Sequence, residues 1–187
     1  LFLKGTPFVY QGQEIGMSNW YPSDPEMYED VQTRWQYNNV ATNKSPEIRL
    51  KRLWDGSRDS ARTPVQWDST QNAGFSTATP WFFVNENYKE VNVAAQEQDE
   101  NSVLNFYRRI IKLRKELPVV KSGKYTEYYK HSSKMQVYSR EDEKQKLLVV
   151  CSYSENSVNF KAPKGFDTNS AELIVQNYAD VETNTLK

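Results

Sequence analysis

The stretch GTPFVYQGQE, residues 5–14, contains a short apolar run followed directly by polar side chains. The run Thr6–Tyr10 is flanked by glycines and begins next to a proline, and this pattern predicts a fully buried β-strand. The polar residues Gln11, Gln13 and Glu14 would then emerge at one end of a sheet. Proteins with α/β folds place their ligand sites at that end, so the stretch predicts an α/β unit with a ligand site beside it.

Three helices are predicted after this strand. Two of them start where a proline follows a capping aspartate or serine, and they cover about Pro25–Asn38 and Pro46–Leu53. The third covers Ser102–Leu117, where apolar residues recur at spacings of three and four and Lys and Arg occupy the other face. Pro118 ends this amphipathic helix.

Beyond the third helix the sequence changes to short β-prone runs separated by clusters of Gly, Asn, Asp and Ser. Such spacing is typical of an antiparallel sheet. We therefore predict two domains, an α/β domain at residues 1–117 and an antiparallel β domain at residues 118–187. The expected strands are Lys124–Tyr129, Met135–Arg140, Lys146–Tyr153, Ser157–Lys161 and Glu172–Val175.

Composition argues against several classes of function. The 24 basic residues are matched by 24 acidic ones, with no basic stripe, which argues against binding to nucleic acid or to an anionic membrane. No membrane span or signal peptide is apparent. The single cysteine, Cys151, and the single histidine, His131, exclude an internal disulfide, a histidine-based catalytic triad and a multi-histidine metal site. We expect no metal and no cofactor, and a reducing, cytoplasmic location.

A long segment rich in turn-forming residues, Trp54–Asn85, is predicted to be an ordered loop, and long ordered loops are usually functional. Residues 56–75 within it read GSRDSARTPVQWDSTQNAGF. Guanidinium and carboxylate groups can hold vicinal hydroxyls, and an indole face can cover a sugar ring. The same residues can also form a salt-bridge network that satisfies only itself, so both interpretations stay open. The residues concerned are Arg58, Asp59, Arg62, Gln66, Trp67 and Asp68.

Five motifs in this order resemble the alpha-amylase superfamily of glycoside hydrolases, in its oligo-1,6-glucosidase and alpha-glucosidase branch. They are GTPFVYQGQEIGMSN (5–19), YEDV (28–31), SRDSARTPVQWD (57–68), NAGF (72–75) and PWFFVNENYKEVNVAAQ (80–96). The resemblance covers essentially the whole chain. It implies an enzyme that cuts alpha-glucosidic bonds at the ends of short oligosaccharides by a retaining mechanism.

The resemblance also implies a place in the fold. Thr6–Tyr10 would be the last strand of a (β/α)8 barrel, Ser102–Leu117 its last helix, and the remainder an incomplete β-sandwich domain behind it. The family's catalytic carboxylates lie on earlier strands, so no catalytic residue is assigned here. We expect the missing N-terminal part of the barrel to belong to the same protein and to be its partner, and the chain alone to be inactive.

By the same resemblance, three residues are candidates for binding the oligosaccharide substrate. Arg58 matches an arginine that holds the terminal glucose through its permanently charged, bidentate group. Gln32 stands where relatives usually carry Glu facing the leaving sugar, which leaves the linkage preference open. Arg62 is a further candidate, although it can instead organise the loop with Asp59 or Asp68 as its partner.

Other functions are compatible with the same sequence. The family scaffold also supports transglucosylation, isomerisation of sucrose to trehalulose and hydrolysis of a phosphorylated trehalose, and fold analogy does not choose among them. A different class is a non-catalytic carbohydrate-binding module that uses aromatic residues of the β domain. Its candidate sugar platforms are Tyr125, Tyr128, Tyr129 and Tyr138, although spaced tyrosines on strands more often serve sheet packing.

Overall fold

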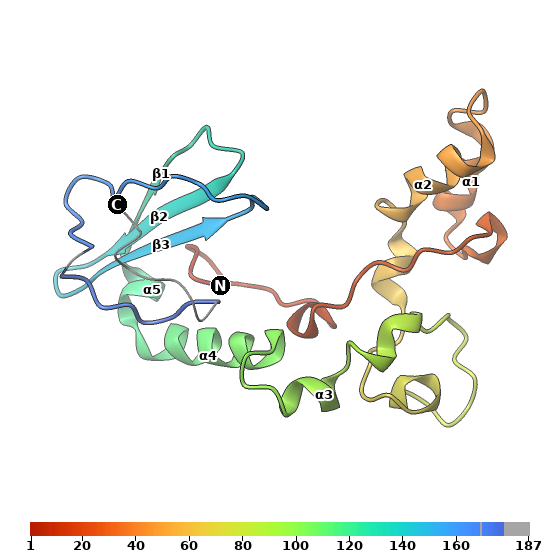
Figure 1. Cartoon of the computed structure of the whole chain (residues 1–187), viewed down its shortest axis with the longest axis horizontal. Coiled ribbons are helices and arrows are strands. Elements are labelled where there is room, and N and C mark those ends of the chain that lie inside the picture. Colours follow the sequence, from red (N-terminus) through yellow and green to blue (C-terminus); the bar gives the residue numbers. More distant parts are fainter. Residues whose placement is uncertain (169, 178–187) are drawn as a thin grey trace. The chain divides into compact units, whose positions relative to one another are not determined.

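A computed structural model describes residues 1–168 and 170–177 of the chain (Figure 1). By their contacts these residues form two compact units. The helical unit is Val9–Asn105, and the sheet unit is Leu1–Phe8 together with the described part of Phe106–Lys187. The domain boundary expected near Leu117 stays a prediction.

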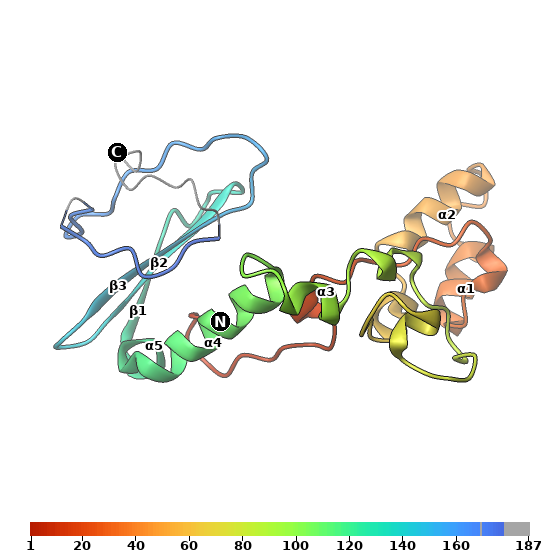
Figure 2. The ribbon, with the colours of Figure 1, turned by 60° about the horizontal axis from the view of Figure 1, so that its bottom comes forward.

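The helical unit contains the helices α1 (Val31–Asn39), α2 (Pro46–Trp54) and α3 (Val93–Glu97). Helices α1 and α2 lie side by side, at the same end of the unit in Figures 1 and 2. They close over a small apolar core made of Trp20, Tyr28, Leu50 and Leu53. Short 3-10 turns make up much of the rest: η1 (Gln13–Ile15), η2 (Pro25–Met27), η3 (Arg58–Arg62), η4 (Gln71–Gly74) and η5 (Glu86–Lys89).

The sheet unit holds a three-stranded antiparallel sheet of order β1-β2-β3. Its strands are β1 (Lys124–Tyr128), β2 (Met135–Glu141) and β3 (Lys146–Ser152). Tyr138 of the central strand faces Glu127 on β1 and Val149 on β3 in the register. The antiparallel arrangement expected from the short β-prone runs is therefore confirmed for these three strands.

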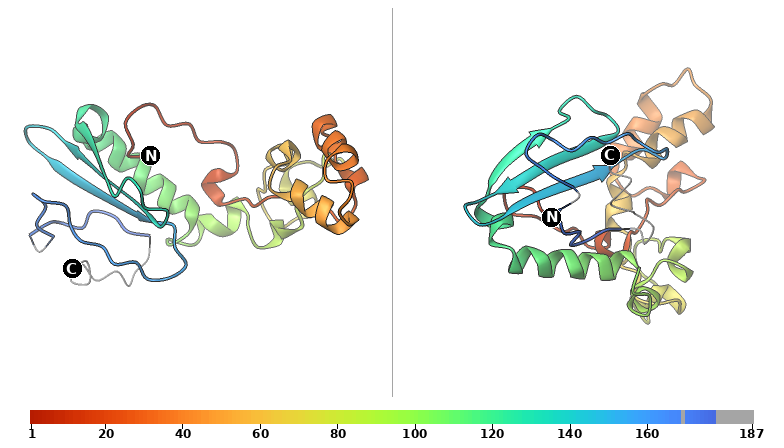
Figure 3. Two further views of the ribbon diagram at one scale, coloured as in Figure 1. Left: turned by 90° about the horizontal axis from the view of Figure 1, so that it is seen from above. Right: turned by 60° about the vertical axis from the view of Figure 1, so that its left-hand side comes forward.

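Alternation along β2 gives the sheet an apolar core on each face, as expected for a strand covered on both sides. Tyr138 packs with helix α4 (Val103–Glu116) and helix α5 (Pro118–Ser122) on one face. Val137 packs with Phe160 on the opposite face. Figure 3 shows the result as layers, with α4 and α5 on one side of the sheet and the later, blue part of the chain on the other.

The first residues of the chain are tied to α4 by a single arginine. The guanidinium of Arg114 donates hydrogen bonds to the carbonyls of Leu1 at 2.5 Å and Gly5 at 2.7 Å, with a longer one to Leu3 at 3.4 Å. Phe2 also enters the core beside α4. The sheet unit therefore joins two segments that are far apart in the sequence.

Several sequence-based expectations differ from the structure. Thr6–Tyr10 has no regular secondary structure and forms no strand, and the side chain of Phe8 is 90% exposed. A strand requires hydrogen-bonded neighbours, and none lies beside this segment among the described residues. Ser157–Lys161 and Glu172–Val175 also form no strand. The helix expected at Pro25–Asn38 is interrupted: η2 ends at Met27, and α1 begins at Val31 behind a new cap.

The remaining expectations agree closely with the observed elements. Helix α2 starts at Pro46 as predicted, and α4 covers all but the ends of the predicted amphipathic helix, with Pro118 directly beyond. His131 is exposed, and Cys151 lies on β3 as a half-buried thiol. None of the helices in the described part of the chain is long and apolar enough to cross a membrane.

Candidate functional site

The N-terminus of α1 carries a buried aspartate that holds the helix start in place. One carboxylate oxygen of Asp30, Oδ2, accepts the backbone N–H of Thr33 at 3.0 Å and its hydroxyl at 2.8 Å. The bond from the backbone N–H caps the helix and satisfies a group that has no partner within it, and the bond from the hydroxyl holds the same carboxylate oxygen. The side chain of Asp30 is only 4% exposed, so its second oxygen needs a partner as well.

That partner comes from the long loop. The Nη2 of Arg58 lies 2.5 Å from Oδ1 of Asp30, which makes a charge-assisted hydrogen bond. The side chain of Arg58 is nevertheless 60% exposed. Arginine carries five N–H donors, so the guanidinium is held on one side and presents donors to solvent on the other.

Asp59, the residue after Arg58, is fully buried and ties the loop to the same helix start. Its Oδ2 accepts hydrogen bonds from the backbone N–H groups of Glu29, at 2.8 Å, and Asp30, at 2.9 Å. Its Oδ1 accepts Nη1 of Arg62 at 3.2 Å, and the same Nη1 lies 3.8 Å from Oδ1 of Asp30. Of the two acids expected to pair with Arg62, the partner is therefore Asp59.

Hydrogen bonds and burial set the protonation of these groups. Burial raises the pKa of Asp30, but the hydrogen bonds from Thr33 and Arg58 outweigh it and leave the pKa below its ordinary value. Tyr28 lies beneath the cluster, fully buried. Burial, together with the nearby charge of Asp59, raises its pKa to about 12. The cluster therefore combines carboxylates and guanidinium groups beside a neutral phenol.

Gln32 lies apart from this cluster. It is the second residue of α1, and its side chain is exposed. Among the described residues, no hydrogen bond or ion pair involves its amide. The structure thus brings Arg58 and Arg62 together on Asp30 and Asp59 and leaves Gln32 facing solvent.

Sequence reasoning missed the residues that hold this cluster, above all Asp30, Thr33 and Ser57. The hydroxyl of Ser57 accepts from the backbone N–H of Asp59 at 3.2 Å and lies 3.1 Å from that of Thr33. The signal that could have found them is a capping pattern, an aspartate followed three residues later by a threonine. The preceding Asp24-Pro25 pair, another strong helix start, concealed it.

The end of the long loop is held in a turn that few residues tolerate. Asn72, Ala73 and Gly74 all have positive φ, at 56°, 57° and 64°. A Cβ on Gly74 would lie 2.5 Å from a carboxylate oxygen of Asp68, so this position requires glycine. Oδ1 of Asp68 accepts hydrogen bonds from the backbone N–H and the hydroxyl of Thr70, and no ion pair between Asp68 and Arg62 is found among the described residues.

A small hollow lies between η1 and η3 in the helical unit. Its volume is about 250 Å³. The hydroxyl of Tyr10 donates to the carbonyl of Ala61 at 3.0 Å across one side of it. Gln11 and Gln13 line it, together with Ser57 and Ser60 from the loop that carries Arg58. Gln11 and Gln13 thus line a hollow, whereas Glu14 does not.

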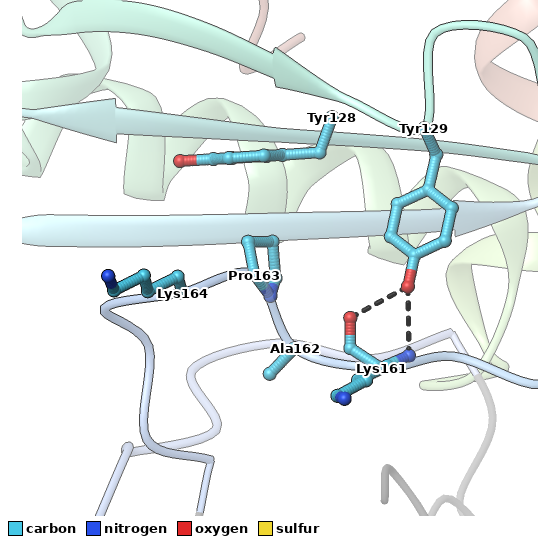
Figure 4. Close-up of a pocket in the computed structure, with 6 residues that line it drawn as sticks. All are labelled: Tyr128, Tyr129, Lys161, Ala162, Pro163 and Lys164. Carbon is cyan, nitrogen blue, oxygen red and sulfur yellow. Dashed lines mark hydrogen bonds between the residues drawn. The ribbon is translucent and has the colours of Figure 1, made fainter.

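A second hollow, an open groove of about 510 Å³, lies on the sheet unit (Figure 4). It is lined by Tyr128, Tyr129 and the segment 161–164. Figure 4 shows the hydroxyl of Tyr129 bonded to the backbone of Lys161, with its carbonyl at 2.7 Å and its N–H at 3.0 Å. The phenol is therefore engaged within the protein. Tyr138 is buried in the sheet core, which removes it from the surface as a sugar platform.

Comparison with known families agrees with the pattern of these elements. A family model described as "Alpha amylase, catalytic domain" matches residues 1–123, well over half of the chain. The chain belongs to the alpha-amylase family. Within this alpha-amylase sequence, the match includes both α1 and the loop that carries Arg58.

Named relatives narrow the similarity within the alpha-amylase family. The chain is 41% identical to an oligo-1,6-glucosidase of Heyndrickxia coagulans over 187 residues, which is 98% of the chain but 33% of that relative. The crystal structure of Bacillus licheniformis trehalose-6-phosphate hydrolase matches with a TM-score of 0.90 and 33% identity, over 97% of this chain and 33% of that one. A trehalulose synthase structure matches with a TM-score of 0.81 and 36% identity, over 89% of this chain and 30% of that one. This alpha-amylase chain therefore spans about a third of the length of the relatives it matches.

Proposed function

We propose that this chain supplies the substrate-holding wall of an alpha-glucosidase of the oligo-1,6-glucosidase type. The observation that carries the proposal is the Arg58 guanidinium, held at 2.5 Å on a buried aspartate while 60% of its side chain stays exposed. A permanently charged group fixed on one side and open on the other is suited to bind vicinal sugar hydroxyls. Similarity to named glycoside hydrolases supports the same reading.

Three binding roles follow within this proposal. Arg58 binds the terminal glucose unit, and Gln32 faces the leaving sugar across the start of α1. Arg62 completes the binding wall chiefly by holding Asp59, with which it forms a 3.2 Å ion pair. The oligosaccharide is the substrate, and no metal or cofactor takes part.

The chemistry is proposed to come from the other two thirds of the relatives' length. Retaining hydrolysis needs two carboxyl groups about 5 Å apart on either side of one bond, one of them protonated. Asp30 and Asp59 do not suit these roles, because both are buried and their oxygens already accept hydrogen bonds. We place the catalytic carboxylates, and the barrel strands beside Thr6–Tyr10, in an N-terminal part of the same cytoplasmic enzyme.

Two experiments test the proposal. The chain alone should not hydrolyse p-nitrophenyl alpha-glucoside, and turnover by the purified chain would contradict it. In the full-length enzyme, Arg58→Ala should lower kcat/KM by about 2–4 kcal/mol in transition-state free energy, because a charged hydrogen bond to the sugar is lost. Arg52→Ala, which removes an exposed arginine of α2, is the matched control and should leave kcat/KM unchanged. An unchanged value for Arg58→Ala would remove this residue from the site.

The reaction subclass is proposed by similarity alone. The matched structures include a trehalose-6-phosphate hydrolase and a trehalulose synthase, so hydrolysis of a phosphorylated disaccharide and isomerisation remain alternatives within the family, as does transglucosylation. Product analysis on isomaltose, sucrose and trehalose 6-phosphate separates them. A non-catalytic sugar-binding module has less support, because Tyr138 is buried and the hydroxyl of Tyr129 is bonded within the protein.

A further inference from the structure

We propose that Asp30 is the positioning residue that holds the Arg58 guanidinium in its sugar-binding orientation, an inference that rests on the proposed function of Arg58. Asp30 itself is too buried to touch the sugar, so it acts through the arginine. The two residues are 28 positions apart in the chain and meet only because the loop folds back onto the start of α1.

The carboxylate of Asp30 cannot rotate without losing hydrogen bonds. Thr33 holds Oδ2 through both its backbone N–H and its hydroxyl, at 3.0 and 2.8 Å. Oδ1 therefore points in one direction, toward Nη2 of Arg58 at 2.5 Å. A fixed acceptor orients the planar guanidinium, and an oriented donor loses less entropy when it binds a ligand.

The backbone on both sides of this pair is fixed as well. The buried carboxylate of Asp59 accepts the N–H groups of Glu29 and Asp30 at 2.8 and 2.9 Å. Asp59 is also the neighbour of Arg58 in the chain, so the loop and the start of α1 are joined directly beside the Asp30–Arg58 pair. A shift of either segment would break bonds to a buried charge, which is costly.

An amide at position 30 could not accept the hydrogen bonds of Thr33 and Arg58 at the same time. Asp30 accepts hydrogen bonds at both oxygens, whereas the side chain of asparagine has one acceptor and one donor group. In Asp30→Asn, the amide oxygen can accept a hydrogen bond from Thr33 or from Arg58. The NH₂ group of the amide then faces the donor that is left without an acceptor. We expect the bond to Thr33 to persist, because it caps the helix, and the bond to Arg58 to be lost.

The first test asks whether Asp30 holds the Arg58 guanidinium in place. It uses the chain itself and needs no activity measurement. The guanidinium signals of Arg58 should be resolved in nitrogen-15 NMR spectra of the wild-type chain, with slow rotation about the Cζ–Nη2 bond. Asp30→Asn should make this rotation fast, and Thr33→Val, which keeps the charge but removes the hydroxyl bond, should do so to a smaller extent. Asp24→Asn is the matched control, because Asp24 caps η2 by accepting the backbone N–H of Glu26 and forms no ion pair with an arginine among the described residues. Unchanged Arg58 signals in Thr33→Val, and in Asp30→Asn if it folds, would overturn the proposal.

Function is tested next in the full-length enzyme by a double-mutant cycle. Asp30→Asn should lower kcat/KM by about 10- to 100-fold, the range of a charged hydrogen bond, and should have no further effect in the Arg58→Ala background. An equal loss in both backgrounds would show that Asp30 does not act through Arg58. If Arg58→Ala alone changes nothing, the proposed function of Arg58 fails, while the NMR result still decides whether Asp30 positions it.

Discussion

Gln32 is the residue proposed to face the leaving sugar, and the structure leaves its side chain exposed in the first turn of α1. Gln32→Glu should raise the ratio of kcat/KM for isomaltose to that for maltose by about 2- to 10-fold, because a carboxylate accepts a sugar hydroxyl more strongly than an amide. The helix start tolerates the added negative charge, so stability should not fall.

The measurement is steady-state kinetics of the full-length enzyme on both disaccharides. Gln145→Glu, at the exposed turn between β2 and β3, is the control for an added charge elsewhere. A ratio that is the same in Gln32→Glu and in wild type would show that position 32 does not face the leaving sugar.

Asp30 also predicts how stability depends on pH. The pKa of Asp30 is lowered in the folded state, so its ionised carboxylate stabilises the fold. This stabilisation is fully present at pH values above the pKa of Asp30 in the unfolded chain, and it is lost as the pH falls through its pKa in the folded state. The charged groups facing it are Arg58, Arg62 and Asp59. Urea unfolding should therefore give a free energy of unfolding that falls from neutral to acid pH.

Asp30→Asn should flatten this dependence, because the amide does not titrate. The two proteins should differ most at neutral pH and converge in acid. A constant difference across the whole pH range would mean that Asp30 does not titrate with folding.

The pairing of Arg58 with Asp30 shows what a single sequence leaves undetermined about a site. The residue types in the loop indicate a polyhydroxylated ligand or a salt-bridge network, and the structure contains such a network with one guanidinium largely exposed. Which acid each arginine meets depends on how the loop folds back over α1. Local patterns do not encode contacts between residues far apart in the chain, so the sequence does not predict Asp30 as the partner of Arg58.

Among the elements, α4 was the most predictable, because its apolar residues keep a helical spacing over its whole length. The start of α1 was harder. Asp24-Pro25 and Asp30 both signal a helix start, and the chain uses the first for a 3-10 turn and the second for the helix. Thr6–Tyr10 has the composition of a buried strand, but a strand depends on neighbours that the local sequence does not contain.

Two adjacent isoleucines of α4 test its packing. Ile110 is 9% exposed and packs against the sheet, whereas Ile111 is 38% exposed. Ile110→Ala should lower the free energy of unfolding by about 2–4 kcal/mol, through lost apolar burial and the cavity left behind. Ile111→Ala should cost less than about 1 kcal/mol.

Urea unfolding followed by circular dichroism measures both variants. The same residue type is removed from the same helix, so the difference reports burial alone. Equal losses in the two variants would contradict the orientation of α4 against the sheet.

For the chain as a whole, the exposed apolar run near its start is a liability. Phe8, Val9 and Tyr10 are 90%, 42% and 57% exposed, in a segment that has no strand partner among the described residues. Such a segment can pair with the same segment of another copy. We therefore expect the purified chain to associate as its concentration rises.

Phe8→Ser should reduce this association, as measured by light scattering over a concentration series. Trp81→Ser is the control, because Trp81 is an exposed aromatic residue in a different loop. If both substitutions reduce light scattering equally, association depends on exposed aromatic area in general. The prediction that residues 8–10 cause it would then be wrong.

The division of the sheet unit between Leu1–Phe8 and the chain beyond Phe106 bears on how the protein is synthesised. The ribosome releases residues in the order of the sequence, and units fold as they are completed. The helical unit is complete once Asn105 has emerged, whereas Leu1 must wait for Arg114 before its carbonyl finds a donor. The pair of Arg58 and Asp30 can therefore assemble during translation before the strands of the sheet have emerged, and a nascent chain arrested once Asn105 has left the ribosome should already contain it.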